Sequence, residues 1–268
     1  MMQPLLDFTD LPVKIPTMSK LIGMVVFFFL YMALLGAQES FKEKQNRYPR
    51  VRQARQNWEV QITALFDSLG IDYPPKKIMV RVFKDEQTLE VWARPESLDA
   101  YRFIKQYPFT AFSGILGPKR KRGDLQIPEG FYRIVNFNPW SEFHLSLGLN
   151  YPNRSDSILG QRNNLGGQIL IHGSSVTIGC IPIGDDAIEQ LYIMCVDVKS
   201  GDQYLLPVYI FPCKMDSIGM VNLDEFAGTD TVLTSFWQNL KQGYDLFEKT
   251  KKLLSYRVNN QGKYIYIE

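Results

Sequence analysis

The sequence predicts an α+β fold in which a mostly antiparallel β domain carries flanking helices at both ends. Three observations support this class. Apolar residues recur every three or four positions over residues 51–69, they alternate with polar residues in short segments between residues 76 and 211, and the helical spacing returns over residues 231–256. At 268 residues the chain can bury a sizeable core, and an aromatic content of 13% favours a packed domain.

Residues 1–37 have the features of an export segment. Two lysines precede an uncharged apolar run over residues 21–37. This run is short for a membrane span and long for the core of a signal peptide, and it is too uniformly apolar for an ordinary core helix. We therefore predict either a signal peptide or an N-terminal membrane anchor, with Met1 or Met18 as the start. Either alternative places the protein in the periplasm or the cell envelope.

Residues 38–75 are predicted to form a polar linker followed by an amphipathic helix. The apolar positions of this helix are Val51, Ala54, Trp58, Ile62, Leu65, Phe66 and Leu69. Their spacing places them on one helical face. Gly70 is a common residue after a helix, and Pro74 and Pro75 prevent its continuation, so the helix is expected to end near residue 70.

Strand-like alternation after residue 76 predicts the β domain itself. The first two strands form a hairpin around a charged turn. Strands are expected at residues 78–83, 88–93, 101–105, 110–115, 131–135, 143–149 and 205–211. Pro207 indicates an edge position for the last of these strands, because proline has no N–H to donate to a neighbour.

The remaining segments are a loop and a C-terminal addition. Residues 151–164 are polar and are expected to form a loop that borders the cleft. Residues 223–268 are predicted to pack on the domain as a helix, over residues 231–256, followed by a strand, over residues 263–267.

Composition excludes several classes of function. The formal net charge is +2, from 30 basic and 28 acidic residues, so no nucleic-acid partner is indicated. The two histidines and three scattered cysteines do not form the spaced ligand sets of a zinc site, and no glycine-rich phosphate loop occurs. We therefore predict no metal and no cofactor. Cys195 lies in an apolar run and is expected to be buried, with pairing to Cys213 after export as an alternative.

The chemically most informative segment covers residues 166–186. Its apolar run ends at His172, and Cys180 follows after small and β-branched residues. A free thiol is only a few per cent ionised at neutral pH, so a nucleophilic cysteine needs a nearby imidazole to take its proton. Gly179 would let the backbone turn its N–H groups towards an oxyanion. A buried structural cysteine is the alternative interpretation, because free cysteine is among the most buried residue types.

A short helix is expected directly after this cysteine. Asp186 and Glu189 have the spacing of a capping box. Because the N-terminus of a helix carries partial positive charge, the helix would lower the pKa of Cys180. Asp185 and Asp186 are therefore interpreted as caps and not as general acids.

This segment resembles the catalytic motif of the L,D-transpeptidases, the YkuD-type enzymes of bacterial cell-wall murein. The resemblance rests on His172-Gly173, on Thr177-Ile178-Gly179-Cys180 and on residues 186–192. The short spacing from the histidine to the cysteine is similar to the YafK-like branch. Two residues depart from the main branch: Ile178 stands where it has a second histidine, and Pro182 where it has an arginine.

Earlier blocks extend the resemblance. Residues 113–119, 123–132 and 143–153 are similar to segments of the same branch, so the resemblance covers roughly residues 76 to 215, and several ordered blocks are harder to match by chance than one motif. It implies an L,D-transpeptidase-type catalytic domain, which we place at residues 76–222.

The resemblance also implies a reaction on murein (peptidoglycan) stem peptides and a role for each residue of the motif. Cys180 would attack a peptide carbonyl and form a thioester, with His172 as general base and later general acid. The backbone carbonyl of Gly173 would orient the imidazole, and Gly179, together with Cys180, would offer backbone N–H groups to the oxyanion.

Substrate-binding residues are expected beside this motif. The basic run over residues 119–122 is of a kind that usually forms a solvated loop, but it could attract an anionic glycan-peptide. Lys119 is the member of this run best placed by the resemblance. Ser175 is the second candidate for substrate binding.

Three alternatives remain open from the sequence. His144 is the other possible base, and on a strand it would share a face with Ser146. The thioester could pass to water instead of an amine, which would make the protein a murein peptide hydrolase or amidase with the same site. A non-catalytic envelope protein that keeps the fold and binds murein is the third alternative.

Overall fold

A computed structural model describes residue 18 and residues 39–201 and 203–267. The predicted export run over residues 21–37 lies outside the described residues. Within the described part of the chain, no helix combines the length and the apolar character needed to cross a bilayer. From Phe41 onward the chain forms one compact unit.

An eight-stranded sheet forms the centre of this unit. Its spatial order is β3 (Arg102–Pro108), β2 (Thr88–Arg94), β1 (Lys77–Phe83), β8 (Leu206–Phe211), β4 (Gly130–Asn138), β5 (Ser146–Leu149), β6 (Leu170–His172) and β7 (Ile181–Pro182). Neighbouring strands are antiparallel except in the pairs β1–β8 and β6–β7, which are parallel. The predicted α+β class with a mostly antiparallel sheet is confirmed.

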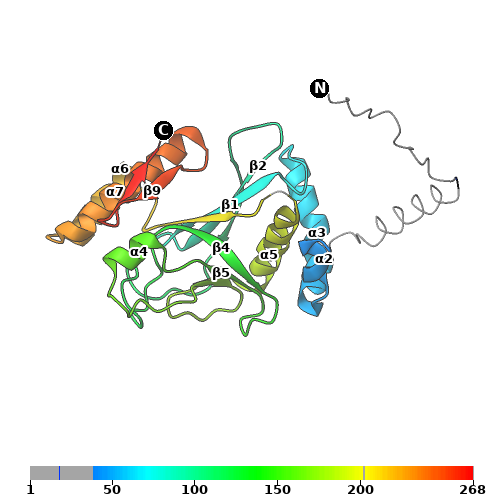
Figure 1. Cartoon of the computed structure of the whole chain (residues 1–268), viewed down its shortest axis with the longest axis horizontal. Helices are drawn as coiled ribbons and strands as arrows, with labels where there is room; N and C mark the ends of the chain where they lie inside the picture. Colours follow the sequence, from blue (N-terminus) through cyan, green and yellow to red (C-terminus); the bar gives the residue numbers. More distant parts are fainter. Residues whose placement is uncertain (1–17, 19–38, 202, 268) are drawn as a thin grey trace, which may run out of the picture. The chain divides into compact units, whose positions relative to one another are not determined.

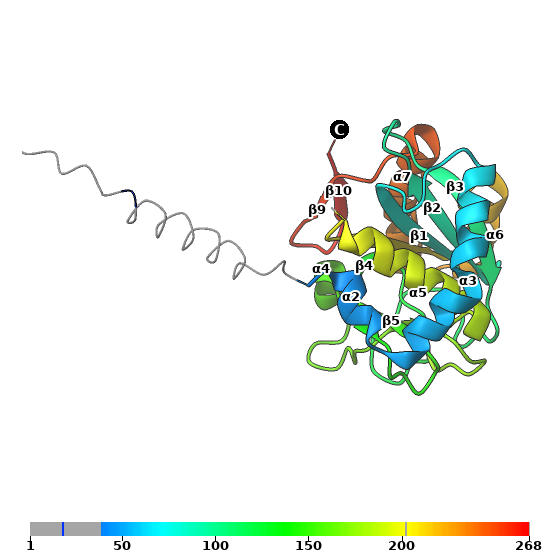
Figure 2. The same ribbon diagram turned by 90° about the vertical axis from the view of Figure 1, so that its right-hand side faces the viewer.

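Helices cover both faces of the sheet (Figures 1 and 2). One core, on the first face, joins the sheet to α3 (Pro49–Ser68) and α5 (Asp185–Ser200), with α2 (Phe41–Asn46) beside them. The other core joins the opposite face to α6 (Ser217–Ala227), α7 (Thr231–Thr250) and the hairpin of β9 (Tyr256–Val258) and β10 (Tyr264–Tyr266). The flanking helices therefore enclose the sheet from two sides.

Strand β1 is buried on both faces of the sheet. Its residues 78, 80 and 82 belong to the first core, and residues 79 and 83 belong to the second. Arg81, on the second face, forms an ion pair of 2.8 Å with Glu248 of α7 and lies over the Phe83 and Phe247 rings. A strand that is buried on both faces reads as a continuous apolar run.

Several predicted elements have different bounds in the structure. Residues 110–115 form no strand, and β5 is shorter than predicted because residues 143–145 lie outside regular structure. The expected polar loop contains the helix α4 (Arg154–Leu159), which Asn153 and Asp156 cap reciprocally. The final long helix stops at Thr250, where Lys251 adopts a left-handed conformation. The described residues also include α6, which the spacing did not predict.

The expectation of an edge position for Pro207 is wrong, because β8 lies between β1 and β4. The ladder between β1 and β8 begins only at Val208, so the missing N–H of Pro207 does not interrupt it. Before the start of this ladder, at Ile78 of β1, the side chain of Gln203 bonds to both the N–H and the carbonyl of Ile78, each at 2.8 Å. A side-chain amide thereby replaces the strand backbone that is missing there.

Two predictions about the region of α5 are also corrected. The capping box is absent: Gly184 is the N-cap residue and makes no side-chain cap, and Asp185 accepts a hydrogen bond of 2.7 Å from the Ser174 N–H. Cys195 and Cys213 are free and buried, and they lie in the cores on opposite faces of the sheet. The alternative of a disulfide between them is therefore not realised.

A buried ion pair attaches the segment before β4 to the sheet and to α7. Lys84 and Glu129 are fully buried and lie 2.9 Å apart. The Lys84 ammonium also donates to the carbonyls of Gly117 and Ile127, at 2.6 and 3.1 Å. Glu129 accepts from the indole N–H of Trp237 in α7, at 2.8 Å. These bonds hold both ends of residues 117–129, the segment that reaches the site described next.

Candidate active site

His172 is the last residue of β6, next to the edge strand β7. It pairs with Ser146 of β5 on one side and with Pro182 of β7 on the other. The side chain is buried, and its Nδ1 lies 2.5 Å from the carbonyl oxygen of Gly173. Because a carbonyl can only accept, Nδ1 carries the proton, and the unprotonated Nε2 is the nitrogen that can act as a base.

Gly173 is required at this position by close packing. A Cβ there would meet the Asp185 carboxylate and lie 2.8 Å from the carbonyl oxygen of Phe143. The Gly173 N–H donates to that same carbonyl, at 3.1 Å. The absence of a side chain therefore lets the backbone of residue 173 sit where its carbonyl can orient the His172 ring.

The ring of Phe143 lies against His172, with centroids 4.5 Å apart. The segment that carries Phe143 is held from outside the sheet: Arg50, at the start of α3, donates to the carbonyls of Ser141 and His144, at 2.6 and 2.7 Å. The amphipathic helix predicted before the β domain therefore supports the wall behind the imidazole.

His144 lies in different surroundings from His172. Its Nε2 is 2.8 Å from Glu189 of α5, and that carboxylate also accepts from Asn57 and from the indole of Trp58, each at 2.9 Å. The residue has a φ of +70°, so it is outside the strand on which the alternation had placed it. Its side chain thus belongs to the contact between α3 and α5.

Cys180 follows a tight turn built on Thr177. The Thr177 hydroxyl accepts from the N–H groups of Gly179 and Cys180, at 3.2 and 2.9 Å, and donates to the Cys180 carbonyl at 2.8 Å. Gly179 has a φ of +123°, and a Cβ there would lie 2.9 Å from the Gln126 carbonyl oxygen. Sequence reasoning assigned no role to Thr177; its spacing from the cysteine is the signal that could have revealed this turn.

His172 and Cys180 line the same cavity, which has a volume of about 540 Å³. Its walls include residues 166–170, residues 176–180 and four residues of an earlier segment, namely Lys119, Arg122, Gly123 and Leu125. The two described side chains are not hydrogen-bonded to each other; the thiol points at the Gln168 carbonyl, 3.7 Å away. Catalytic contacts are commonly long before substrate binds, so a thiol and an imidazole that line one cavity are suited to nucleophilic attack.

The electrostatics of the cavity favour a neutral pair. Burial lowers the pKa of His172, an effect that the Gly173 carbonyl partly offsets. Burial likewise raises the pKa of the Cys180 thiol above its usual 9.0, although the Leu170 backbone and the charge of Lys119 oppose this. The pKa of Cys180 is therefore raised and not lowered, contrary to the effect expected from the helix that follows, because burial outweighs the opposing influences.

This neutral pair leads to a testable pH dependence. Because burial raises the pKa of the Cys180 thiol, even less of it is ionised at neutral pH than the few per cent expected of a free thiol. The rate of alkylation by iodoacetamide should therefore keep rising with pH into the alkaline range. Mass spectrometry of the labelled peptide measures this rate, with Cys180→Ala as the control. A plateau of high reactivity between pH 6 and 8 would instead indicate a preformed thiolate–imidazolium pair.

Of the two predicted substrate-binding residues, only Lys119 lines this cavity. Its ammonium bonds to Asp124 at 2.6 Å and to the Lys121 carbonyl at 3.0 Å, so the loop holds it in place. Ser175 is exposed and lies outside the cavity lining, next to Ser174, whose carbonyl accepts from the Thr110 hydroxyl at 2.6 Å.

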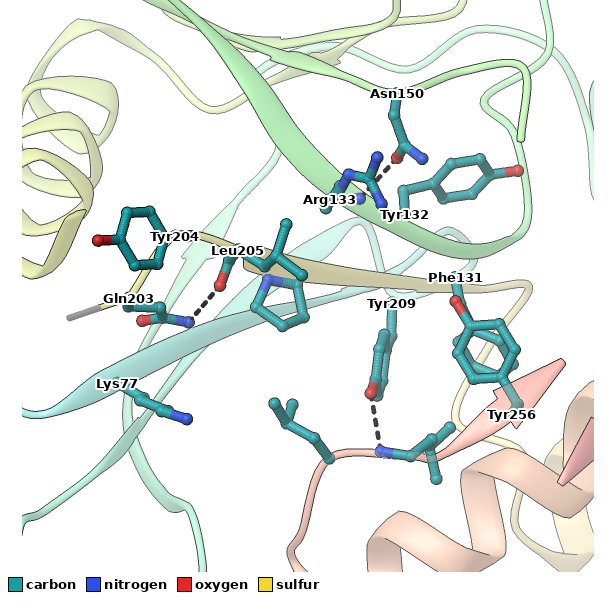
Figure 3. A pocket seen from close by; sticks show the side chains of 13 residues that line it. Lys77, Phe131, Tyr132, Arg133, Asn150, Gln203, Tyr204, Leu205, Tyr209 and Tyr256 are labelled. Atoms are coloured by element: carbon teal, nitrogen blue, oxygen red, sulfur yellow. Dashed lines mark hydrogen bonds between the residues drawn. The ribbon is translucent and has the colours of Figure 1, made fainter. Parts of the chain in front are cut away.

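A second cavity, of about 440 Å³, lies beside β4 and β8 (Figure 3). Lys77, Arg133 and several tyrosines line it, and the Tyr209 hydroxyl accepts there from the Leu254 N–H at 3.0 Å. Among its described lining residues there is neither a cysteine nor a histidine. Because Cys180 and His172 both line the first cavity, the candidate active site is placed there.

Comparison with known proteins identifies the family of the chain. Residues 77–210 match the family model described as YkuD, L,D-transpeptidase catalytic domain. The protein named "Putative L,D-transpeptidase YafK" from Escherichia coli (strain K12) is 30% identical over 190 residues, which cover 70% of this chain and 73% of that protein.

Two solved structures are similar to part of this chain. The helical cell shape determining protein Pgp2 from Campylobacter jejuni is 20% identical with a TM-score of 0.41, over 68% of this chain and 73% of that chain. Bdellovibrio bacteriovorus Bd1075 is 21% identical with a TM-score of 0.37, over 67% and 74%. With the family model and the relative from Escherichia coli, the resemblance seen in the motif is confirmed: the chain belongs to the L,D-transpeptidase family with a YkuD-type catalytic domain.

Proposed function

We propose that the protein is a cysteine-dependent murein L,D-transpeptidase that acts on peptidoglycan stem peptides through a thioester on Cys180. The observation that carries this proposal is the shared cavity. A thiol and an imidazole line it, and the imidazole has its Nδ1 proton fixed on the Gly173 carbonyl. Membership of the family supports the reaction class, and the apolar run over residues 21–37 supports action in the cell envelope.

The first half-reaction forms the thioester. His172 Nε2 takes the thiol proton as the sulfur attacks a carbonyl carbon of the donor peptide, which places a negative charge on the carbonyl oxygen. The intermediate then collapses: the C–N bond breaks, the imidazolium gives its proton to the departing amine, and the acyl group stays on the sulfur. Thiol and imidazole start as neutral groups, in keeping with the shifted pKa of each.

The oxyanion requires donors that the resting turn already uses. The N–H groups of Gly179 and Cys180, which we assign to this role, both donate to the Thr177 hydroxyl. A substrate oxygen can take these donors only by displacing that hydroxyl, which then turns to another partner. Thr177 thus keeps the two N–H groups aligned until substrate arrives, and its hydroxyl is the group that must move when the oxyanion forms.

The second half-reaction decides between transfer and hydrolysis. An incoming amine attacks the thioester carbonyl, His172 takes the amine proton, and the sulfur leaves as thiolate and recovers its proton from the imidazolium. Water would follow the same route and give a murein peptide hydrolase. The identity of the acceptor therefore separates the two activities.

Mass spectrometry of the full-length chain with murein tetrapeptide tests the proposal. We expect a covalent adduct that maps to Cys180 and resolves to cross-linked product when an amine acceptor is present. Cys180→Ala should bind the peptide without forming an adduct. An adduct that yields only hydrolysed peptide with excess acceptor would establish a hydrolase, and the absence of any adduct would refute the thioester chemistry and leave a murein-binding role to test.

A further inference from the structure

A polar cavity adjoins the thiol cavity. It has a volume of about 530 Å³, and its lining includes Arg122, Arg162, Asn163, Asn164 and Gly166. Arg122 and Gly166 line both cavities, so the two spaces share a wall. We refer to this second space, defined by these five residues, as the basic annex.

The annex has a preformed floor. Two backbone hydrogen bonds of 2.7 Å join its loops, from the Gln161 N–H to the Arg120 carbonyl and from the Arg122 N–H to the Asn164 carbonyl. Gly166 has a φ of +77°, and a Cβ on it would lie 3.5 Å from Arg122 Cα. The two loops therefore hold the backbones of Arg122 and residue 162 in place before any ligand binds.

The charges of the annex are not neutralised by the protein. Arg122 and Arg162 have exposed side chains, and neither guanidinium has an ion-pair or hydrogen-bond partner within the described residues. The acids of the neighbouring segments are already engaged: Asp124 binds Lys119 and the N–H groups of residues 120 and 121, and buried Asp156 binds Tyr132 at 2.9 Å. Two guanidiniums beside amide side chains thus face solvent without a counter-charge.

The geometry points to a carboxylate as the ligand of this annex. We propose that Arg122 and Arg162 bind a free carboxylate of the murein peptide while its reacting carbonyl lies at Cys180. A guanidinium presents two parallel donors that match the two oxygens of a carboxylate, which a lysine ammonium does not. This inference rests on the proposed function, because it takes the annex and the thiol cavity as parts of one substrate site.

The annex also accounts for a departure in the motif. Pro182 occupies the position where the main branch of the family has an arginine, and it lies in β7, where no cation can be supplied from that residue. The anionic part of the substrate would instead be recognised by Arg122 and Arg162, which come before the histidine in the chain.

Binding to the full-length Cys180→Ala protein tests the proposal without chemistry. The probes are a murein tetrapeptide with free carboxylates and the same peptide with those carboxyl groups amidated, compared by calorimetry. We expect the free acid to bind about tenfold more tightly, as a charge-assisted hydrogen bond implies. Arg122→Gln and Arg162→Gln should each remove most of that preference, and Arg122→Lys should restore only part of it.

Arg102→Gln is the matched control, since Arg102 is an exposed arginine on β3, the opposite edge strand of the sheet, and lines neither cavity. Equal binding of the two peptides would overturn the proposal, as would equal weakening of both peptides in the arginine variants. Failure of the thioester is recognised separately: a carboxylate preference without an adduct on Cys180 refutes the chemistry, and an adduct without the preference refutes the annex.

Discussion

His172→Asn is expected to lower kcat/KM by about two to four orders of magnitude, the usual contribution of a positioned general base. The residue lines the thiol cavity, and its protonated Nδ1 is held by the Gly173 carbonyl, which leaves Nε2 as the acceptor. Asparagine has no basic nitrogen to take the proton. Steady-state turnover of murein tetrapeptide, measured alongside thermal unfolding, separates loss of the base from loss of the fold.

His144→Asn is the matched control for this substitution. His144 has a φ of +70°, which asparagine tolerates better than most residues. The variant loses one hydrogen bond to Glu189, which still binds Asn57 and Trp58. Its activity should stay within a few-fold of wild type, with a stability loss of about 1 kcal/mol. A severe effect at His144 with a mild effect at His172 would show that the base has been assigned to the wrong histidine.

Glu129→Ala should lower the free energy of unfolding by about 3–5 kcal/mol, because it leaves the fully buried ammonium of Lys84 without its counter-charge. The change also leaves the N–H groups of Gly117 and Trp237 without their acceptor. Urea denaturation of the full-length chain measures the loss. Activity should fall as well, since residues 117–129 carry Lys119, Arg122 and part of the wall beside Cys180.

An exposed ion pair provides the comparison for this prediction. Lys76 and Glu96 form a salt bridge in which the Glu96 side chain is 72% exposed. Glu96→Ala should change stability by no more than about 1 kcal/mol, as expected for solvent-screened pairs. If both variants lose a similar free energy of unfolding, the buried ammonium of Lys84 does not need the counter-charge of Glu129.

Much of the site was visible in the sequence because its chemistry is local. His172, Gly173, Gly179 and Cys180 lie within one short segment, so the order of residue types was sufficient to indicate a thiol, a base and a turn. The resemblance to the family added the fold around them. Their roles stay predictions, to be tested by the adduct and by the two histidine variants.

Other features depended on contacts between distant segments. Thr177 could be read as a motif residue, but its bonds to Gly179 and Cys180 appear only in the folded turn. In the basic annex, backbone hydrogen bonds connect the segment of Arg122 to the loop of residues 161–164, about 40 positions later in the chain. Neither the spacing of apolar residues nor a basic run contains information about such a pairing.

The sequence by itself determined the α+β class, the first hairpin and the helix before it, because alternation and helical spacing directly record which side of each element is buried. Only the tertiary structure decided the central place of β8 with its Pro207 and the pairing of Lys84 with Glu129. Each of these depends on which distant segment provides the hydrogen-bond partner. A partner that is distant in the sequence produces no periodic pattern of apolar residues.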